Sequence, residues 1–299
     1  MKTVSASVPG KVLVSGGYLI LDPSNKGLVL STTARFKTTV SLEECSDSSH
    51  GSHSCNRLVS VYSKQFRMTW EYSFHVGQIA SCNNQIEQLN TESVGKNVYI
   101  ETTVSLTLAY FAVKGQDTSW WPGNRKLFIV LAADNDFYSQ KSYLIENSMN
   151  ATRKNLKALP NCLPIKKVDG KLAKTGMGSS AALISSLVGA LYCFFKKEYV
   201  VQNIALEKIH KISQICHCVA QGKVGSGFDV SAAIFGSQTY QRFSPDKLQS
   251  IFNASLTQES ITHLVENQSW DYKVVSCRKH IRTLNFCRLV SNYRNIWNY

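Results

Sequence analysis

Residues 174–183, near the middle of the chain, most strongly constrain what it can fold into. They read Lys-Thr-Gly-Met-Gly-Ser-Ser-Ala-Ala-Leu and lead into an apolar run that predicts a helix over 178–195. Glycines let backbone N–H groups turn into one concavity, and a helix N-terminus adds unpaired N–H groups and a positive dipole end. This combination favours a bound anion, usually phosphate. The alternative is simple helix capping by a serine.

Composition sets the class of protein around this loop. The 299 residues suit one large or two moderate domains, and with 43% apolar and 18% charged residues they can bury a sizeable core. The net charge of +13 favours anionic partners. No aromatic-plus-basic module of a nucleic-acid reader is present, so we expect small anionic ligands and no nucleic acid.

Cysteine usage and the termini indicate an intracellular protein. Nine cysteines form no repeating frame, which is typical of reduced thiols. Cys216-His-Cys218 lacks zinc-site spacing and favours a core position, and His50 and His53 favour a solvated loop. No signal peptide opens the chain, and the run over 181–195 is too short to span a bilayer. We expect a cytoplasmic protein off the membrane. The peroxisome is the alternative, although the final Trp-Asn-Tyr is no peroxisomal signal.

Hydrophobic periodicity predicts a sheet followed by helices. Strands are expected over 3–8, 12–14, 28–30, 36–42, 126–132 and 237–243, with 57–74 returning to the sheet. Helices are expected over 98–113, 178–195, 203–219 and 231–235. The polar segment 83–96 predicts a loop or weak helix, and 134–161 an exposed helix or loop near a ligand mouth. After Trp270 no pattern is recognisable.

Three glycine-containing segments together indicate phosphoryl transfer. They are residues 9–11, 174–183 and 225–229. Such a reaction needs cations, aligned N–H donors, a metal and a group that orients the acceptor. The segments supply these as Lys11, Lys174 and Lys223, the N–H groups of 176–180, Ser180 as a metal ligand and Asp229. Structural alternatives remain open, because Asp229 could cap a short helix and the lysines could be solvated.

A dinucleotide-binding site is the competing interpretation of the same loop. Residues 176–181 match G-x-G-x-x-A, and Glu198 follows at a suitable distance. The preceding residues, 166–171, do not predict the buried parallel strand that such a site requires. An oxidoreductase is therefore the less favoured alternative.

The three segments resemble the motifs of the GHMP kinases. Residues 9–18, Pro-Gly-Lys-Val-Leu-Val-Ser-Gly-Gly-Tyr, are similar to the first motif, and residues 174–183 to the second, phosphate-binding motif. Residues 220–230, with Gly236-Ser-Gln and Arg242-Phe-Ser, resemble the phosphomevalonate kinase branch, particularly its plant form. The resemblance covers residues 1–272.

This resemblance implies an α+β fold. Residues 1–245 would form the N-terminal, ATP-binding domain, which is similar to ribosomal protein S5 domain 2. Residues 246–272 would begin a C-terminal domain that is largely missing, and 273–299 would be a divergent, poorly ordered basic tail. We expect a truncated form, with an apolar face uncovered and with low solubility or activity, because the family's third glycine-rich motif is not found.

The resemblance also implies the reaction and its residues. ATP, with Mg²⁺, would phosphorylate 5-phosphomevalonate to 5-diphosphomevalonate in isoprenoid synthesis, with Lys11 and Asp229 as the catalytic residues and Ser180 as the metal ligand. The expected ATP-binding residues are Lys174, Thr175, Gly176, Met177, Gly178, Ser179, Ser180 and Ala181. The expected substrate-binding residues are Lys11, Lys223, Ser226 and Gly227.

Two points stay open. Mevalonate kinase relatives place a glutamate as second metal ligand between the matching serine and aspartate, and the acids in that interval here are Glu198 and Glu207. Neither lies in an obvious motif. A nucleotide-binding module without catalysis is the alternative that the missing third motif favours.

Overall fold

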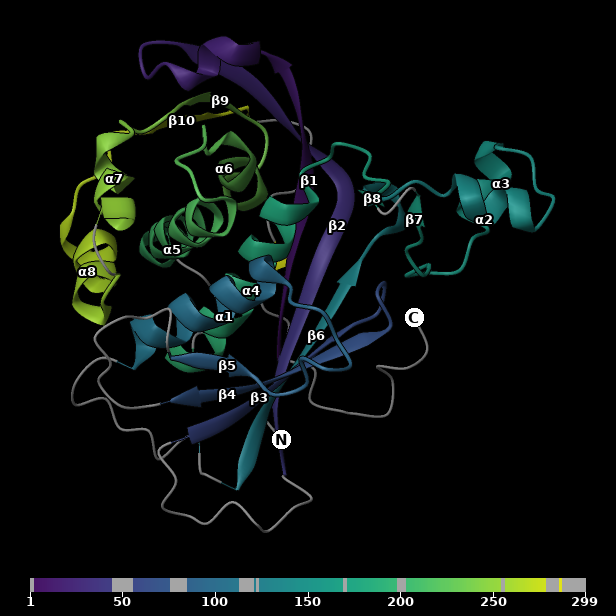
Figure 1. Cartoon of the computed structure of the whole chain (residues 1–299). Helices are drawn as coiled ribbons and strands as arrows, with labels where there is room; N and C mark the ends of the chain where they lie inside the picture. The colour runs from purple at the N-terminus through teal and green to yellow at the C-terminus, as the bar shows by residue number, and fades with distance from the viewer. Residues whose placement is uncertain are drawn as a thin grey trace.

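A single large sheet covered by helices forms the body of the protein (Figure 1). The computed structural model describes residues 3–44, 56–75, 85–112, 121, 124–168, 171–197, 203–253, 256–277 and 285–286. The nine strands of the sheet have the order β10-β9-β2-β6-β3-β4-β5, with β1 beside β2 and β11 beside β1. β3 and β6 are parallel, and the other described pairs of this sheet are antiparallel.

The strands have the following bounds. They are β1 (Thr3–Ser15), β2 (Lys26–Glu44), β3 (Asn56–Ser63), β4 (Met68–His75), β5 (Ile86–Gln88), β6 (Arg125–Ala133), β9 (Gln238–Gln241), β10 (Lys273–Ser276) and β11 (Asn285–Phe286). Two further strands, β7 (Lys167–Val168) and β8 (Lys171–Leu172), form a separate antiparallel pair.

β2 organises the sheet because it is long enough to have three neighbours. One edge pairs with β1, and the other pairs first with β9 and then with β6. The predicted break at Pro9-Gly10 is a register shift within one continuous strand β1, because β2 continues to pair with it on both sides. The separate strands expected over 28–30 and 36–42 are likewise one strand.

The helices are as follows. They are η1 (Gly17–Leu21), α1 (Val98–Phe111), η3 (Asn135–Phe137), α2 (Lys141–Glu146), α3 (Arg153–Lys157), α4 (Ser179–Lys196), α5 (Asn203–Gln221), α6 (Phe228–Phe235), α7 (Asp246–Asn253), α8 (Gln258–Thr262) and the π-helical turn η4 (His263–Asn267). The predicted helices α1, α4, α5 and α6 are confirmed.

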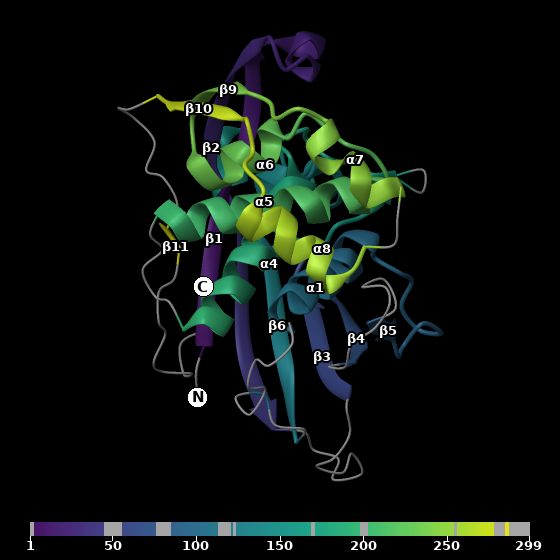
Figure 2. The same cartoon turned by 90° about the vertical axis from the view of Figure 1, so that its left-hand side faces the viewer.

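The main core lies between the sheet and α4. Strand residues Val40, Val61 and Ile129 and helix residues Ile184 and Leu187 are completely buried. α4 packs on β1 and β2, while α1 and α5 pack against α4 (Figure 2). The stripe predicted on α5 faces this core, with Ala205, Ile209, Ile212 and Cys216 buried and Val219 half-buried. The helical layer therefore fixes where α4 begins.

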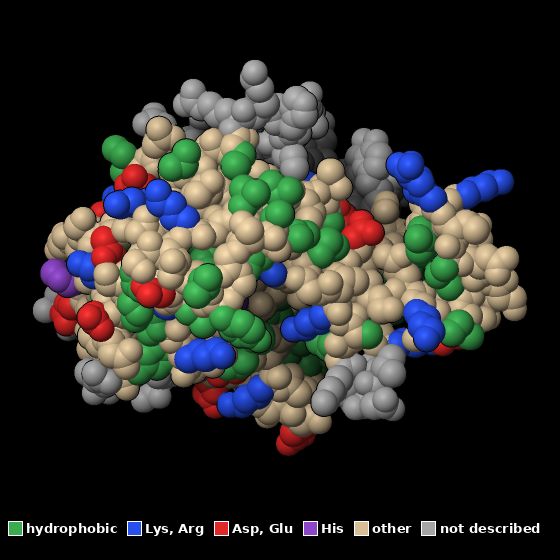
Figure 3. Space-filling view, turned by 90° about the horizontal axis from the view of Figure 1, so that it is seen from above, with side chains coloured by type: hydrophobic (Ala, Val, Ile, Leu, Met, Phe, Trp, Pro, Cys, Tyr) green, Lys and Arg blue, Asp and Glu red, His purple; other side chains and the backbone are tan. Residues whose placement is uncertain are grey.

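A β-arm extends beyond this core at one end of the molecule. The ends of β1 and β2 and the turn η1 form it (Figure 1). Ile20 anchors the arm in a small cluster with Val29, Ala232 and Tyr240. Other apolar side chains of the arm are exposed, among them Tyr18, which is 92% exposed. Figure 3, seen from this end, shows hydrophobic side chains around a hollow with Lys or Arg beside it.

Two sequence expectations were wrong about short strands. Residues 86–88 pair with β4 as an edge strand, where a loop or weak helix was expected. Lys273–Ser276 pair with β9, although residues 273–299 were expected to form a poorly ordered tail. The proposed division into domains stays a prediction.

Candidate phosphate-binding site

The loop before α4 is held in place by backbone contacts with η3. Thr175 donates through its N–H to Phe137 O at 3.2 Å and through its hydroxyl to Asp136 O at 2.7 Å. Lys174 forms a β-bridge with Tyr138. The first residues of segment 134–161, which was expected to lie near a ligand mouth, therefore support the glycine-rich loop.

The start of α4 leaves its first N–H groups without a capping side chain. The N-cap residue is Gly178 in a left-handed conformation, with φ 74°, and no side chain caps the helix. Ser179 is the first helical residue, so the alternative of simple serine capping is wrong. Uncapped N–H groups at a helix N-terminus favour an anion. The geometry therefore suits the predicted phosphate.

Lys11 joins the first motif to the second. Its backbone N–H donates to Met177 O, and its Nζ donates to Gly176 O, both at 3.0 Å. Its side chain crosses Gly178 so closely that a Cβ there would lie 3.0 Å from Lys11 Cε. Lys11 Nζ also lies 5.2 Å from the ring centroid of Phe228, beside Asp229. One lysine therefore contacts the loop and borders the third segment.

Buried polar side chains donate hydrogen bonds to the backbone carbonyl groups of the third segment, residues 225–229. Arg242 donates to Gly225 O at 2.6 Å, Tyr240 to Ser226 O at 3.0 Å and Gln214 to Gly227 O at 2.8 Å. Burial raises the pKa of Tyr240 and lowers that of Arg242. These contacts hold the chain rigidly up to the start of α6.

Asp229 and Ser180 meet at one histidine nitrogen. His217 Nε2 lies 3.9 Å from Asp229 Oδ2 and 3.3 Å from Ser180 Oγ. Asp229 Oδ1 accepts from Val230 N at 3.0 Å, but the N-cap residue of α6 is Gly227 with no capping side chain. The carboxylate thus bonds its own helix locally, and its second oxygen lies near His217 Nε2.

The remaining predicted residues differ in exposure. Lys174 and Lys223 are exposed, with Lys174 Nζ 5.9 Å from the ring centroid of Tyr99. Ser179 and Ala181 are buried, and Met177 and Ser226 are half-buried. The roles of all these residues stay predictions.

Neither acid considered as a second metal ligand is placed at this site by the described residues. Glu207 is an exposed residue of α5 whose charge acts on Lys211 and Tyr272, and Glu198 lies outside the described residues, as do His50 and His53. Cys216 and Cys218 pack in the core as predicted, and burial raises their pKa to about 12 and about 11. Their thiols are therefore protonated at neutral pH.

Sequence reasoning missed His217, Gln214 and Gln221, which lie beneath the predicted residues. Gln221 Nε2 is 2.9 Å from His217 Nε2. The signal was present as His-x-x-x-Gln twice on one helix, but His217 was interpreted as part of a cysteine-flanked core segment.

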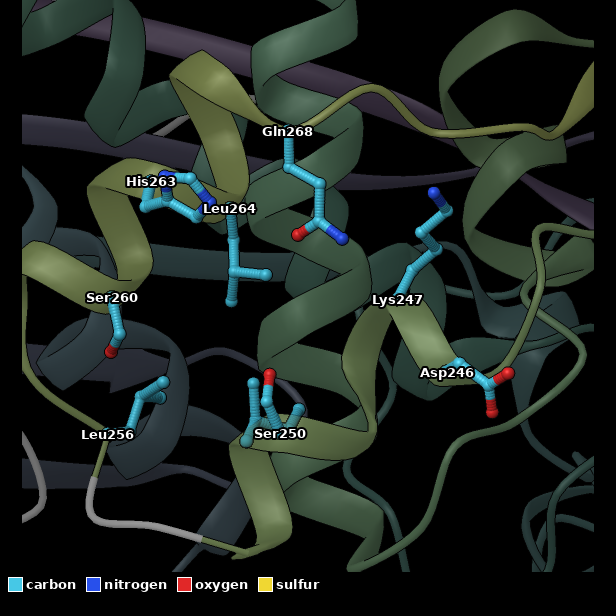
Figure 4. Close-up of a pocket in the computed structure, with 9 residues that line it drawn as sticks. Asp246, Lys247, Ser250, Leu256, Ser260, His263, Leu264 and Gln268 are labelled. Atoms are coloured by element: carbon cyan, nitrogen blue, oxygen red, sulfur yellow. The ribbon is translucent and has the colours of Figure 1, made fainter.

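A separate pocket lies between α7 and the α8–η4 segment (Figure 4). Its volume is about 390 Å³, and Lys247, Ser250, His263 and Gln268 contribute polar groups to its lining. None of the residues predicted for phosphate or acceptor lines it.

One described helix, α4, is long and apolar enough to cross a membrane. Most of it is buried inside the protein, as in the core helix of a globular protein.

The strands β7 and β8 that precede the glycine-rich loop are antiparallel. A dinucleotide-binding domain requires a parallel strand there, so that alternative is wrong.

Comparisons with known proteins agree with this geometry. Residues 146–237 match the family model "GHMP kinases N terminal domain". Two curated relatives are a phosphomevalonate kinase of Aspergillus fumigatus, 32% identical over 89% of this chain, and a peroxisomal phosphomevalonate kinase of Arabidopsis thaliana, 34% identical over 90%. The chain spans 57% of the length of each.

Two solved structures share the fold at low identity. A Listeria innocua protein has a TM-score of 0.59 at 14% identity, covering 94% of this chain and 59% of that one. A Streptococcus pneumoniae phosphomevalonate kinase has a TM-score of 0.51 at 16% identity, covering 92% and 58%. Residues 146–237 therefore match the N-terminal domain of the GHMP kinases, and the chain is similar to curated phosphomevalonate kinases.

Proposed function

We propose that this chain binds ATP on residues 174–181 and transfers the γ-phosphoryl group to 5-phosphomevalonate, giving ADP and 5-diphosphomevalonate. The observation that carries the proposal is the meeting of three motifs. Lys11 bonds the glycine-rich loop, and His217 Nε2 lies within 4 Å of both Ser180 and Asp229. Phosphoryl transfer depends on such positioning more than on covalent chemistry.

The acceptor chemistry sets the role of Asp229. A phosphate monoester has its second pKa near 6, so at neutral pH the acceptor is already mostly a dianion. Asp229 therefore has little proton to remove and acts by orienting Lys11 or the acceptor. Lys11 offsets the charge between the two anions, ATP and phosphomevalonate. Lys223, which is close in sequence to Ser226 and Gly227, contributes to the same effect.

Magnesium fits this donor set as a partner of ATP. Mg²⁺ binds through oxygen ligands, commonly one or two carboxylates together with substrate phosphates and water. Ser180 and Asp229 offer a hydroxyl and a carboxylate on either side of His217. Bound there, the ion would neutralise phosphate charge, and the described residues contain no group of three or more His, Cys, Asp or Glu that would hold it without ATP.

The similar proteins support phosphomevalonate as the proposed acceptor. The Streptococcus pneumoniae structure holds phosphomevalonate and AMPPNP. We expect the same two ligand classes here, and isoprenoid synthesis as the process served. The cytoplasm is the expected compartment, with the peroxisome as alternative because the Arabidopsis relative is peroxisomal.

Phosphorus NMR on the purified full chain tests the proposal. Mg-ATP is supplied with phosphomevalonate, or with mevalonate as the matched acceptor that lacks the phosphate. Diphosphomevalonate signals that require phosphomevalonate support the proposal. Binding of ATP without transfer to either acceptor would contradict kinase activity and favour the nucleotide-binding module.

A further inference from the structure

Helix α5 carries the same histidine–glutamine pair twice. His210 pairs with Gln214 and His217 with Gln221, with distances of 3.0 Å and 2.9 Å between the histidine Nε2 and the glutamine Nε2. Residues seven apart lie on one face of a helix. Both pairs therefore face the third segment.

The two pairs do different things. Gln214 of the first pair donates to Gly227 O, and His210 is completely buried beside the rings of Phe235 and Tyr272. The second pair lies two turns further along, where His217 reaches Ser180 and Asp229. The first pair supports the backbone of the segment, whereas the second contacts predicted site residues.

The hydrogen bonds of His217 decide how Ser180 is oriented. The Gln221 amide nitrogen can only donate, so His217 Nε2 accepts and its ring proton is on Nδ1. The single lone pair of Nε2 is then shared by the Gln221 N–H and the Ser180 O–H. The Ser180 hydroxyl has one proton, and its neighbour at 3.3 Å is that accepting nitrogen. When Ser180 donates this proton to His217, the Ser180 oxygen has only lone pairs for other partners.

We propose that His217 is a positioning residue that accepts the Ser180 hydroxyl proton and so turns the Ser180 lone pairs toward the cation bound with ATP. This proposal rests on the proposed function. The His217 side chain is only 5% exposed, so it acts through Ser180 instead of touching substrate. Removing such an outer partner of a metal ligand typically costs about 10- to 100-fold in metal affinity or activity.

Manganese EPR in the presence of an ATP analogue tests the proposal on the full chain, because it measures bound ion without catalysis. His217→Leu removes the acceptor at similar volume, and we expect Mn²⁺ to bind about tenfold or more weakly. His217→Gln returns an oxygen near the Nε2 position and restores most of the affinity. His263→Leu is the matched control, because it removes a histidine of the separate pocket between α7 and α8 that has no part in the site, and it leaves Mn²⁺ affinity unchanged.

A second measurement needs no change at His217. In ¹⁵N-histidine-labelled protein, Ser180→Ala should shift the His217 Nε2 resonance, whereas an unchanged resonance overturns the proposal. Equal Mn²⁺ affinity in His217→Leu and wild type, with weaker binding in Ser180→Ala, overturns this proposal alone. Wild-type protein that binds no metal–nucleotide complex overturns the proposed function as well.

Discussion

Gly178→Ala separates the backbone of the loop from the contact that Lys11 makes with it. Gly178 has φ 74°, and an added Cβ would lie 3.0 Å from Lys11 Cε and 3.1 Å from Cγ. Gly176 is the matched control, because its φ is 84° but an added Cβ would meet nothing within 4 Å. Both alanine variants therefore carry the left-handed strain, and only Gly178→Ala requires the Lys11 side chain to shift, by a few tenths of an ångström.

The structure gives a magnitude for each effect. Left-handed strain costs about 1–3 kcal/mol, of which the alanine recovers about 0.4–1 kcal/mol by restricting the unfolded chain. A net loss of about 1 kcal/mol lowers Tm by about 2–4 °C in both variants. A hydrogen bond to a charged group contributes about 1.5–3 kcal/mol, so disturbing the bond from Lys11 Nζ to Gly176 O should weaken ATP binding by up to about tenfold in Gly178→Ala alone.

Thermal unfolding and calorimetric titration with an ATP analogue measure the two effects. Adding Lys11→Met to Gly178→Ala should weaken binding no further, because both changes remove the same contact. Equal affinities in Gly176→Ala and Gly178→Ala would refute the reasoning, as would full additivity in the double variant.

Three other predictions concern the acceptor side of the candidate site, the packing of the core and the buried side chain of His210. Asp229→Asn should retain affinity for ATP without metal and lower transfer to phosphomevalonate by about 100-fold, since misplacing a reactant has that size of effect; unchanged turnover in a steady-state assay would contradict it. Ile184→Ala should lower the free energy of unfolding by about 2–5 kcal/mol in urea titrations, because Ile184 is completely buried. Burial, with Lys211, lowers the pKa of His210 from 6.5 to about 3, so the unfolded chain takes up that proton first. Stability should therefore fall from pH 6.5 toward pH 3 by up to about 1.4 kcal/mol per pH unit, and this component of the slope should be missing in His210→Leu.

Local patterns predicted the elements whose residues carry their own signal. The apolar run after Gly178 and the stripe on α5 gave helices close to their observed bounds, because periodic burial on one face is encoded locally. Long-range pairing decided the rest. Three residues of β5 and four of β10 are too short to show alternation, and their partners β4 and β9 fix them.

The candidate site also contains residues that their type and spacing predicted and residues that only long-range contacts bring to it. The loop, Lys11 and Asp229 were predicted from their residue types and spacing, and the structure brings Lys11 to the loop. His217 was not, because its importance depends on α5 lying beneath both Ser180 and Asp229. A histidine flanked by cysteines on an apolar helix face is otherwise typical of a core.

Hydrogen–deuterium exchange of the full chain with and without a Mg–ATP analogue tests the central claim most directly. The account predicts slower exchange at residues 174–183, where the first N–H groups of α4 have no capping side chain, and unchanged exchange around the pocket between α7 and α8. Unchanged exchange at 174–183 with saturating analogue, or protection confined to the α7–α8 pocket, would contradict it.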